Sequence, residues 1–154
     1  MGRKIRLGII GVGQIGKSHV NTYKSVPDCE IVAVADLNKD EAERVAAANG
    51  IPRVFTKFRQ MLKMDEFDAV DVCLHNNFHA PVTMAALEAG KHVYCEKPMA
   101  GAYPDAKRMY ETAKKCGRKL GIQLSTLFSK ETKAAKRLID EGLLGKVYFV
   151  KSYG

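Results

Sequence analysis

The sequence predicts an α/β fold in which a doubly wound parallel sheet is covered by helices on both faces. Six short apolar runs alternate with helical patterns through residues 1–125. The runs are apolar on both faces, which is typical of strands buried between two layers of helices. Glycines at 50, 90 and 117 each follow a helical pattern, where a left-handed residue can end a helix. Alternating strands and helices of this kind indicate βαβ units, and therefore parallel pairing.

The elements follow one another in a simple order. We expect strands at residues 5–10, 30–35, 53–56, 69–74, 92–95 and 119–124. Between them we expect helices at residues 14–26, 39–49, 57–63, 79–89 and 104–116. Pro104 supports the last of these starts, because a proline in the first turn of a helix loses no hydrogen bond.

The end of the chain departs from this alternation. Residues 129–145 form another helical pattern with a glycine stop, and residues 146–154, "KVYFVKSYG", favour a strand. We therefore expect two domains, a nucleotide-binding one at 1–125 and, at 126–154, the helix and first strand of a second α+β domain that is missing or only begun. The alternative is that the last strand lies on the edge of the first sheet.

The amino-acid composition limits the classes of protein to which the chain can belong. The 154 residues are 46% hydrophobic and 27% charged, as in a soluble globular protein. No apolar run approaches the roughly 20 residues of a membrane-spanning helix, and we expect no membrane partner. The four cysteines show no CxxC pair and no metal-ligand spacing, so we expect reduced thiols, no metal site and a cytoplasmic location.

The net charge of +8 lies in the last third of the chain. Residues 107–151 hold 12 basic and 4 acidic residues, whereas residues 1–106 hold 13 of each. A nucleic-acid surface is one interpretation. We favour solvated faces of two amphipathic helices and expect no nucleic-acid partner, because no aromatic residues are interleaved with the charges.

A glycine pattern follows the first predicted strand. In "GIIGVGQIG", Gly11, Gly13 and Gly16 form GxGxxG between a strand and a helix. Gly11 allows a tight turn, Gly13 lets a pyrophosphate approach the backbone, and Gly16 lets the helix pack closely on the strand. The free N–H groups at the helix start, around Gln14 and Ile15, favour phosphate. This context predicts the Rossmann dinucleotide-binding fold.

Asp36 directly follows the second predicted strand, 20 residues after Gly16. A carboxylate at this position accepts hydrogen bonds from ribose hydroxyls and repels a 2′-phosphate, so we predict NAD rather than NADP as the cofactor. Lys39 or Arg44 could weaken this preference. The alternative is an aspartate that only caps the next helix.

A polar cluster follows the fourth predicted strand. His75, Asn76 and His79 lie within "CLHNNFHAP", and Leu74 ends the strand before them, at the strand end that faces the ligand in open α/β sheets. We predict contacts with the cofactor. The alternatives are that Asn77 or His79 caps the following helix and that His75 is a solvent-facing loop residue.

The fifth predicted strand ends in Glu96, Lys97 and Pro98, beside this polar cluster. With GxGxxG, Asp36, "NNFHAPVTMAALEAGKHVYCEKPMA" and "IDEGLLGKVYFVKSYG", the chain resembles the Gfo/Idh/MocA family of sugar and inositol dehydrogenases along essentially its whole length. The resemblance implies that Lys97 reaches the substrate hydroxyl and nicotinamide ribose, that Glu96 lies beside the nicotinamide, and that Pro98 aims the lysine inward. Leu74 and His75 depart from the Thr-Pro pair common in relatives.

The sequence therefore predicts the NAD-binding domain of an oxidoreductase that moves a hydride between a nicotinamide and a sugar, inositol or related polyol. Lys97 is the predicted catalytic residue. In relatives a second domain supplies the substrate pocket, so we expect this chain alone to be inactive and the full-length parent to act on a small-molecule polyol as a homo-oligomer. The alternative is a stand-alone NAD-binding redox sensor or regulatory module.

Overall fold

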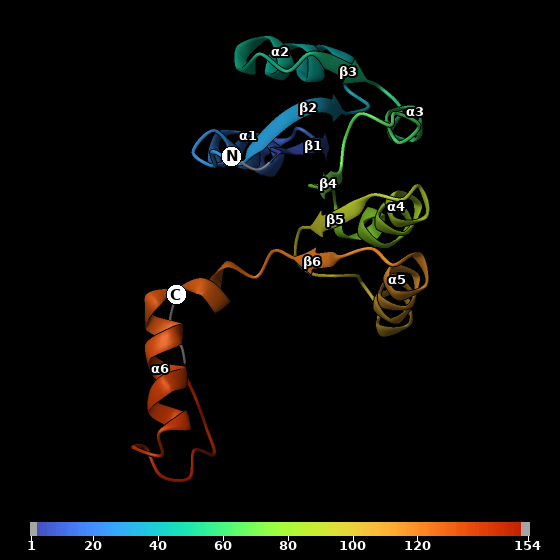
Figure 1. Ribbon diagram of the computed structural model, residues 1–154. Helices are drawn as coiled ribbons and strands as arrows, with labels where there is room; N and C mark the ends of the chain where they lie inside the picture. The colour runs from blue at the N-terminus through green and yellow to red at the C-terminus, as the bar shows by residue number, and fades with distance from the viewer. Residues whose placement is uncertain (1–2, 152–154) are drawn as a thin grey trace. The chain divides into compact units, whose positions relative to one another are not determined.

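The structure is a computed structural model that describes residues 3–151 (Figure 1). The chain divides into two compact units, the first ending at Gln123 and the second beginning at Leu124. Each unit is described by itself.

The first unit is built on one parallel sheet. Its strands are β1 (Ile5–Ile10), β2 (Cys29–Ala35), β3 (Arg53–Phe55), β4 (Ala69–Val72), β5 (His92–Cys95) and β6 (Leu120–Ile122). They lie in the order β3-β2-β1-β4-β5-β6, and every neighbouring pair is parallel. The chain thus winds one way from β1 and then the other way from β4. The predicted doubly wound Rossmann fold is confirmed.

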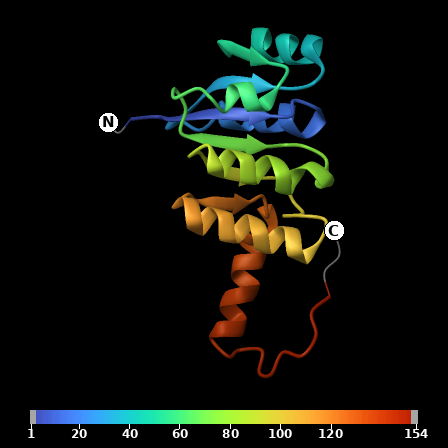
Figure 2. The ribbon, with the colours of Figure 1, turned by 90° about the vertical axis from the view of Figure 1, so that its right-hand side faces the viewer.

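Helices cover both faces of the sheet (Figures 1 and 2). They are α1 (Gln14–Tyr23), α2 (Lys39–Asn49), α3 (Phe58–Met61), α4 (Asn76–Glu88) and α5 (Tyr103–Cys116). The α1 and α2 face packs around Ile9, and the α3, α4 and α5 face packs around Ile10. Because successive strand residues point to opposite faces, these two isoleucines belong to different halves of the core. Burying each contributes roughly 1.5–3 kcal/mol.

Local signals explain where the helices begin and end. The Asn38 side chain accepts the Glu41 N–H at 3.1 Å and starts α2, and Gly50, at φ 65°, ends it. The prediction for α4 was wrong at its start: the helix begins at Asn76, three residues early, and Pro81 lies in its second turn. The helix tolerates this proline because its core face, with Ala80, is buried against the sheet.

The second unit contains a 3-10 helix, η1 (Ser125–Phe128), and α6 (Lys130–Asp140). Ser129 caps α6 by accepting the Thr132 N–H at 3.1 Å. The predicted last strand is wrong where the structure describes it: residues 146–151 form no strand, and residues 152–154 lie outside the described part. β-propensity favours an extended backbone, but a strand also needs a neighbour for its ladder. The domain assignment of residues 126–154 stays a prediction.

Two surface properties bear on the charge and membrane predictions. The basic residues of α5 and α6 that we assigned to solvated faces are exposed: Lys107, Arg108, Lys114, Lys115, Lys133, Lys136 and Arg137. Among residues 3–151, no helix has the length and apolar character needed to cross a bilayer.

Candidate functional site

A cleft of about 680 Å³ opens at the carboxyl ends of β1, β2, β4 and β5. It lies where the winding direction reverses, because the loops after β1 and β4 run to opposite faces of the sheet. Its walls are Ile10, Gly11, Gly13, Gln14, Ile15, Ala35, Asp36, Leu37, Thr56, Phe58, Cys73, Leu74, His75, Asn76, Phe78, Val82, Glu96 and Lys97. All of the predicted site residues line it except Gly16 and His79.

The glycine loop fits a dinucleotide pyrophosphate. At Gly11, φ is 91° and an added Cβ would lie 2.4 Å from the Cys73 carbonyl oxygen. At Gly16 a Cβ would lie 2.0 Å from the Gly11 carbonyl oxygen, so this glycine packs α1 on the loop rather than lining the cleft. A Cβ at Gly13 would meet nothing within 4 Å, which leaves open space above this part of the backbone. No side chain caps α1, so its first-turn N–H groups remain available to an anion.

Asp36 connects two walls of the cleft. One carboxylate oxygen accepts the Val12 N–H at 2.8 Å, and the other accepts the Asn38 N–H at 2.9 Å. Each oxygen of a carboxylate accepts about two hydrogen bonds, so capacity for ribose hydroxyls remains. The capping alternative is wrong, because Asn38 caps α2. Next to Asp36, the Leu37 side chain is 90% exposed and adds an apolar surface to the cleft.

Glu96 and Lys97 form the opposite wall. The Glu96 N–H donates to the Val72 carbonyl at 3.0 Å and extends the β4–β5 pairing by one residue. One Glu96 carboxylate oxygen accepts the Lys97 N–H at 3.0 Å. The Lys97–Pro98 peptide bond is cis, and Lys97 is exposed to the cleft.

His79 does not reach the cleft. Its side chain is fully buried, with Nδ1 2.6 Å from the Pro98 carbonyl oxygen and Nε2 2.9 Å from the Leu74 carbonyl oxygen. The predicted cofactor contact of His79 is therefore wrong. Because α4 begins at Asn76, the ring lies one turn into the helix and joins the loop after β4 to the loop after β5. The cap position is His75, so neither Asn77 nor His79 caps α4.

A buried network that we did not predict from the sequence lies behind Glu96. His19 Nδ1 lies 2.7 Å from Asp71 Oδ2, and His19 Nε2 lies 3.1 Å from Glu96 Oε1. The Tyr23 hydroxyl donates to Asp71 at 2.9 Å, and the Cys73 sulfur lies 3.3 Å from His19 Nδ1. The hydrogen bond to Asp71 raises the pKa of His19; burial opposes this shift, and the charges of Asp71 and Glu96 add to it. An acid inside a strand apolar on both faces was the signal available, since a buried carboxylate needs a partner.

Two cysteines of this region, Cys73 and Cys95, are buried. Burial raises the pKa of the Cys73 thiol far above its ordinary value and that of Cys95 to about 11, so both remain protonated near neutral pH. Donor atoms of His19, Asp71 and Cys73 lie within 4.8 Å of one another. We assign no metal to them, because the short Nδ1–Oδ2 contact is a direct hydrogen bond.

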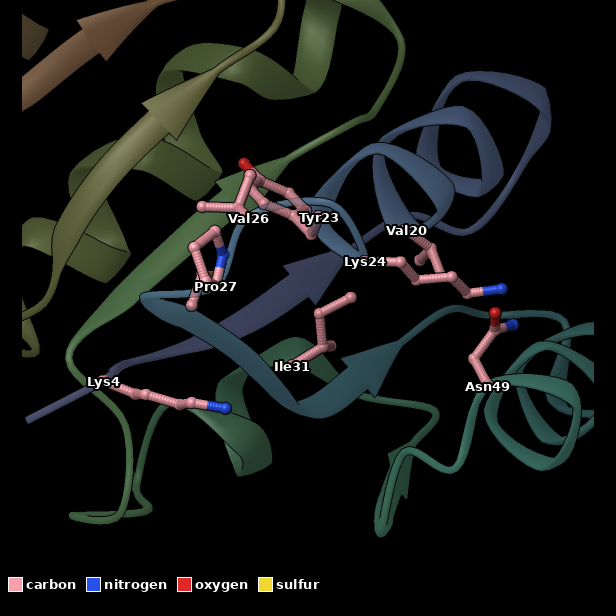
Figure 3. A pocket seen from close by; sticks show the side chains of 9 residues that line it. Lys4, Val20, Tyr23, Lys24, Val26, Pro27, Ile31 and Asn49 are labelled. Atoms are coloured by element: carbon pink, nitrogen blue, oxygen red, sulfur yellow. The ribbon is translucent and has the colours of Figure 1, made fainter.

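A smaller hollow of about 200 Å³ lies near the other end of α1 (Figure 3). Tyr23 and Lys24 contribute to it from that helix end, and Ile31 contributes from β2. None of the predicted site residues lines it. The larger cleft is therefore the candidate site.

Comparisons with known proteins agree with this geometry. Residues 5–124 match the family model GFO_IDH_MocA, described as "Oxidoreductase family, NAD-binding Rossmann fold". D-glucoside 3-dehydrogenase of Escherichia coli is 37% identical over 145 residues, covering 94% of this chain and 41% of that protein. Myo-inositol 2-dehydrogenase of Thermotoga maritima is 29% identical over 147 residues, covering 96% of this chain and 44% of that protein.

Solved structures show the same fold. The WlbA dehydrogenase from Bordetella pertussis, in complex with NADH and UDP-GlcNAcA, superposes with a TM-score of 0.90 at 31% identity, covering 95% of this chain and 45% of that one. Scyllo-inositol dehydrogenase from Lactobacillus casei, with bound NAD(H) and scyllo-inositol, gives a TM-score of 0.88 at 26% identity, covering 94% and 43%. The chain thus spans less than half the length of these relatives.

Proposed function

The chain belongs to the Gfo/Idh/MocA family of oxidoreductases, and from that premise we propose that it is the NAD-binding part of a dehydrogenase acting on a CH–OH group. The substrate class that we propose is a sugar, an inositol or a related polyol. The relatives named for a glucoside and for myo-inositol support this class.

The observation that carries the proposal is the convergence of three predicted features on one cleft. The open backbone at Gly13 and the start of α1 suit the pyrophosphate, and Asp36 suits the adenosine ribose. Glu96 and Lys97 line the same cleft from the end of β5, where the nicotinamide half would lie. We propose that Leu74, His75 and Asn76 form the remaining wall of that half.

Lys97 is the residue that we propose for catalysis. When bound, NAD supplies the hydride acceptor. An ammonium close to the reacting oxygen stabilises the negative charge that develops there as the hydroxyl proton passes to a base, which we propose is supplied from outside residues 1–154. The Glu96 carboxylate accepts the Lys97 N–H and so holds the backbone from which this side chain extends. A redox sensor has no need of a lysine at this position.

We propose that residues 1–154 by themselves bind NAD(H) without oxidising polyols. Positioning the substrate carbon near the nicotinamide contributes up to roughly 7–11 kcal/mol, and this requires contacts on the substrate as well as on the cofactor. We propose that the cleft described above supplies the contacts on the dinucleotide. Polyol-dependent NADH formation by this chain alone would refute this part of the proposal.

The cofactor test is a fluorescence titration with NADH and NADPH. We expect NADH to bind more tightly, because the Asp36 carboxylate accepts ribose hydroxyls and repels a 2′-phosphate. Asp36→Ala should weaken NADH and narrow the difference between the two cofactors. Asp28→Ala, at an exposed aspartate outside the cleft, is the matched control and should leave both affinities unchanged. Equal or tighter binding of NADPH by the wild-type chain would contradict the role of Asp36.

Two further predictions concern the chain in solution. A homo-oligomer is expected and light scattering measures it. A cytoplasmic location is expected from the reduced cysteines, and thiol titration of protein purified without reductant tests it.

A further inference from the structure

His19 lies between two carboxylates. Its side chain is 12% exposed, and its two ring nitrogens face Asp71 at 2.7 Å and Glu96 at 3.1 Å. Ionised carboxylates only accept hydrogen bonds, so both contacts are satisfied together only by a ring that carries two N–H groups. The geometry therefore favours the imidazolium form.

Asp71 needs that positive charge. Its side chain has no solvent exposure, and Oδ1 has no hydrogen-bond partner among the described residues. Oδ2 accepts hydrogen bonds from His19 and from the Tyr23 hydroxyl. A buried carboxylate is costly unless a counter-charge is close, and His19 is the cationic group within contact distance. The burial of Asp71 in β4 therefore keeps the His19 ring positively charged.

Glu96 receives the other end of the imidazolium. Oε1 accepts from His19, and Oε2 accepts the N–H of Lys97. His19 therefore holds the Glu96 carboxylate from the core side, and the Lys97 N–H holds it from the loop side. It is also part of the cleft wall.

We propose that the His19 imidazolium is a positioning residue that fixes the Glu96 carboxylate at the nicotinamide end of the cleft, and that Asp71 maintains its charge. This inference rests on the proposed NAD-binding function. The groups that face His19 are Asp71 from β4, Cys73 directly after β4, Tyr23 from α1 and Glu96 directly after β5.

As a consequence, the hydrogen bond from His19 to Glu96 depends on pH. When the ring loses a proton, the remaining N–H stays with Asp71, whose contact is the shorter and more buried one. Nε2 then presents a lone pair to the Glu96 carboxylate, which repels it. Glu96 is released as pH rises through the pKa of His19.

NADH affinity tests this coupling in the 154-residue chain. We expect His19→Gln and Glu96→Gln each to weaken NADH by about fivefold, the scale of one lost hydrogen bond. Because His19 acts through Glu96, the double variant should bind no more weakly than Glu96→Gln alone. His92→Gln, the same change at a histidine outside the cleft, is the control and should bind as wild type. Additive losses, or unchanged affinity in His19→Gln, would overturn the proposal.

An NMR titration without cofactor separates this inference from the proposed function. The Glu96 side-chain carboxyl carbon should shift at the pH where the His19 ring titrates, and Asp71→Asn should move both events to lower pH. A Glu96 signal that does not follow His19 would refute the positioning role, whatever the cofactor result. Absence of NADH binding by the wild-type chain would instead refute the proposed function, and the titration would still decide the role of His19.

Discussion

Gly13→Ala separates cofactor binding from folding. Gly13 precedes α1 with φ −63° and ψ −161°, an extended conformation that alanine also adopts. An added Cβ meets no atom within 4 Å, yet it stands in the cleft wall where a pyrophosphate would contact the backbone. The methyl group therefore costs the free protein little and obstructs the ligand.

The expected changes in the free energy of unfolding and in NADH affinity differ in size. Alanine restricts the unfolded chain more than glycine does but is a poorer residue before a helix, so the free energy of unfolding should change by less than about 1 kcal/mol. Loss of close contact between phosphate oxygens and the backbone N–H groups should cost about 2 kcal/mol, which weakens NADH by about 30-fold.

Urea unfolding and NADH fluorescence titration measure the two quantities on the same preparation. Gly101→Ala is the matched control, because a Cβ at Gly101 also meets nothing within 4 Å and this glycine lies outside the cleft. It should change neither quantity. If Gly13→Ala binds NADH as tightly as the wild-type chain, the pyrophosphate does not lie over this glycine and our account of the loop is wrong.

Three further predictions concern stability. Gly16→Ala should lower the free energy of unfolding by about 2 kcal/mol or more, because its Cβ would lie 2.0 Å from a backbone oxygen; urea unfolding measures this, and a wild-type midpoint would contradict it. His79→Phe should lower the free energy of unfolding by about 2 kcal/mol, because a phenyl ring cannot make the hydrogen bonding by which the buried His79 ring joins the Leu74 and Pro98 carbonyls; an unchanged melting temperature would contradict this role of His79. The raised pKa of His19 predicts a contribution to stability that is fully present below its ordinary value of 6.5 and is lost as pH rises through the folded-state pKa. Urea unfolding from about pH 6 to about pH 9 should show that loss in the wild-type chain and not in His19→Gln, and equal slopes would count against it.

Much of the fold was predictable because its signals are local. The helix at residues 39–49 was predicted with its observed bounds, since Asn38 starts it and Gly50 ends it within the same short segment. The last strand was not predictable from propensity, because a strand exists only with a neighbour, and sequence preference says nothing about whether one is present.

The site residues were likewise predictable only where their signals are local in the sequence. Gly13, Asp36 and Lys97 carry their signal in nearby residues, and the structure brings all three to the cleft. The His79 contact was mispredicted because it depends on where α4 begins. The contacts of His19 join residues that are 52 and 77 positions apart, and only the pairing of β1, β4 and β5 brings them together.

Helix α1 connects the two halves of the cleft. Its first turn borders the open space at Gly13, and one turn further on His19 reaches Glu96 at the other half. Gly16 makes this possible, because a Cβ there would lie 2.0 Å from the Gly11 carbonyl oxygen and 3.5 Å from the Cys73 side chain. A helix held farther from β4 would keep its phosphate-facing N–H groups but would carry His19 away from Asp71. The last glycine of GxGxxG therefore governs the Glu96 end of this cleft as well as the close packing usually assigned to it.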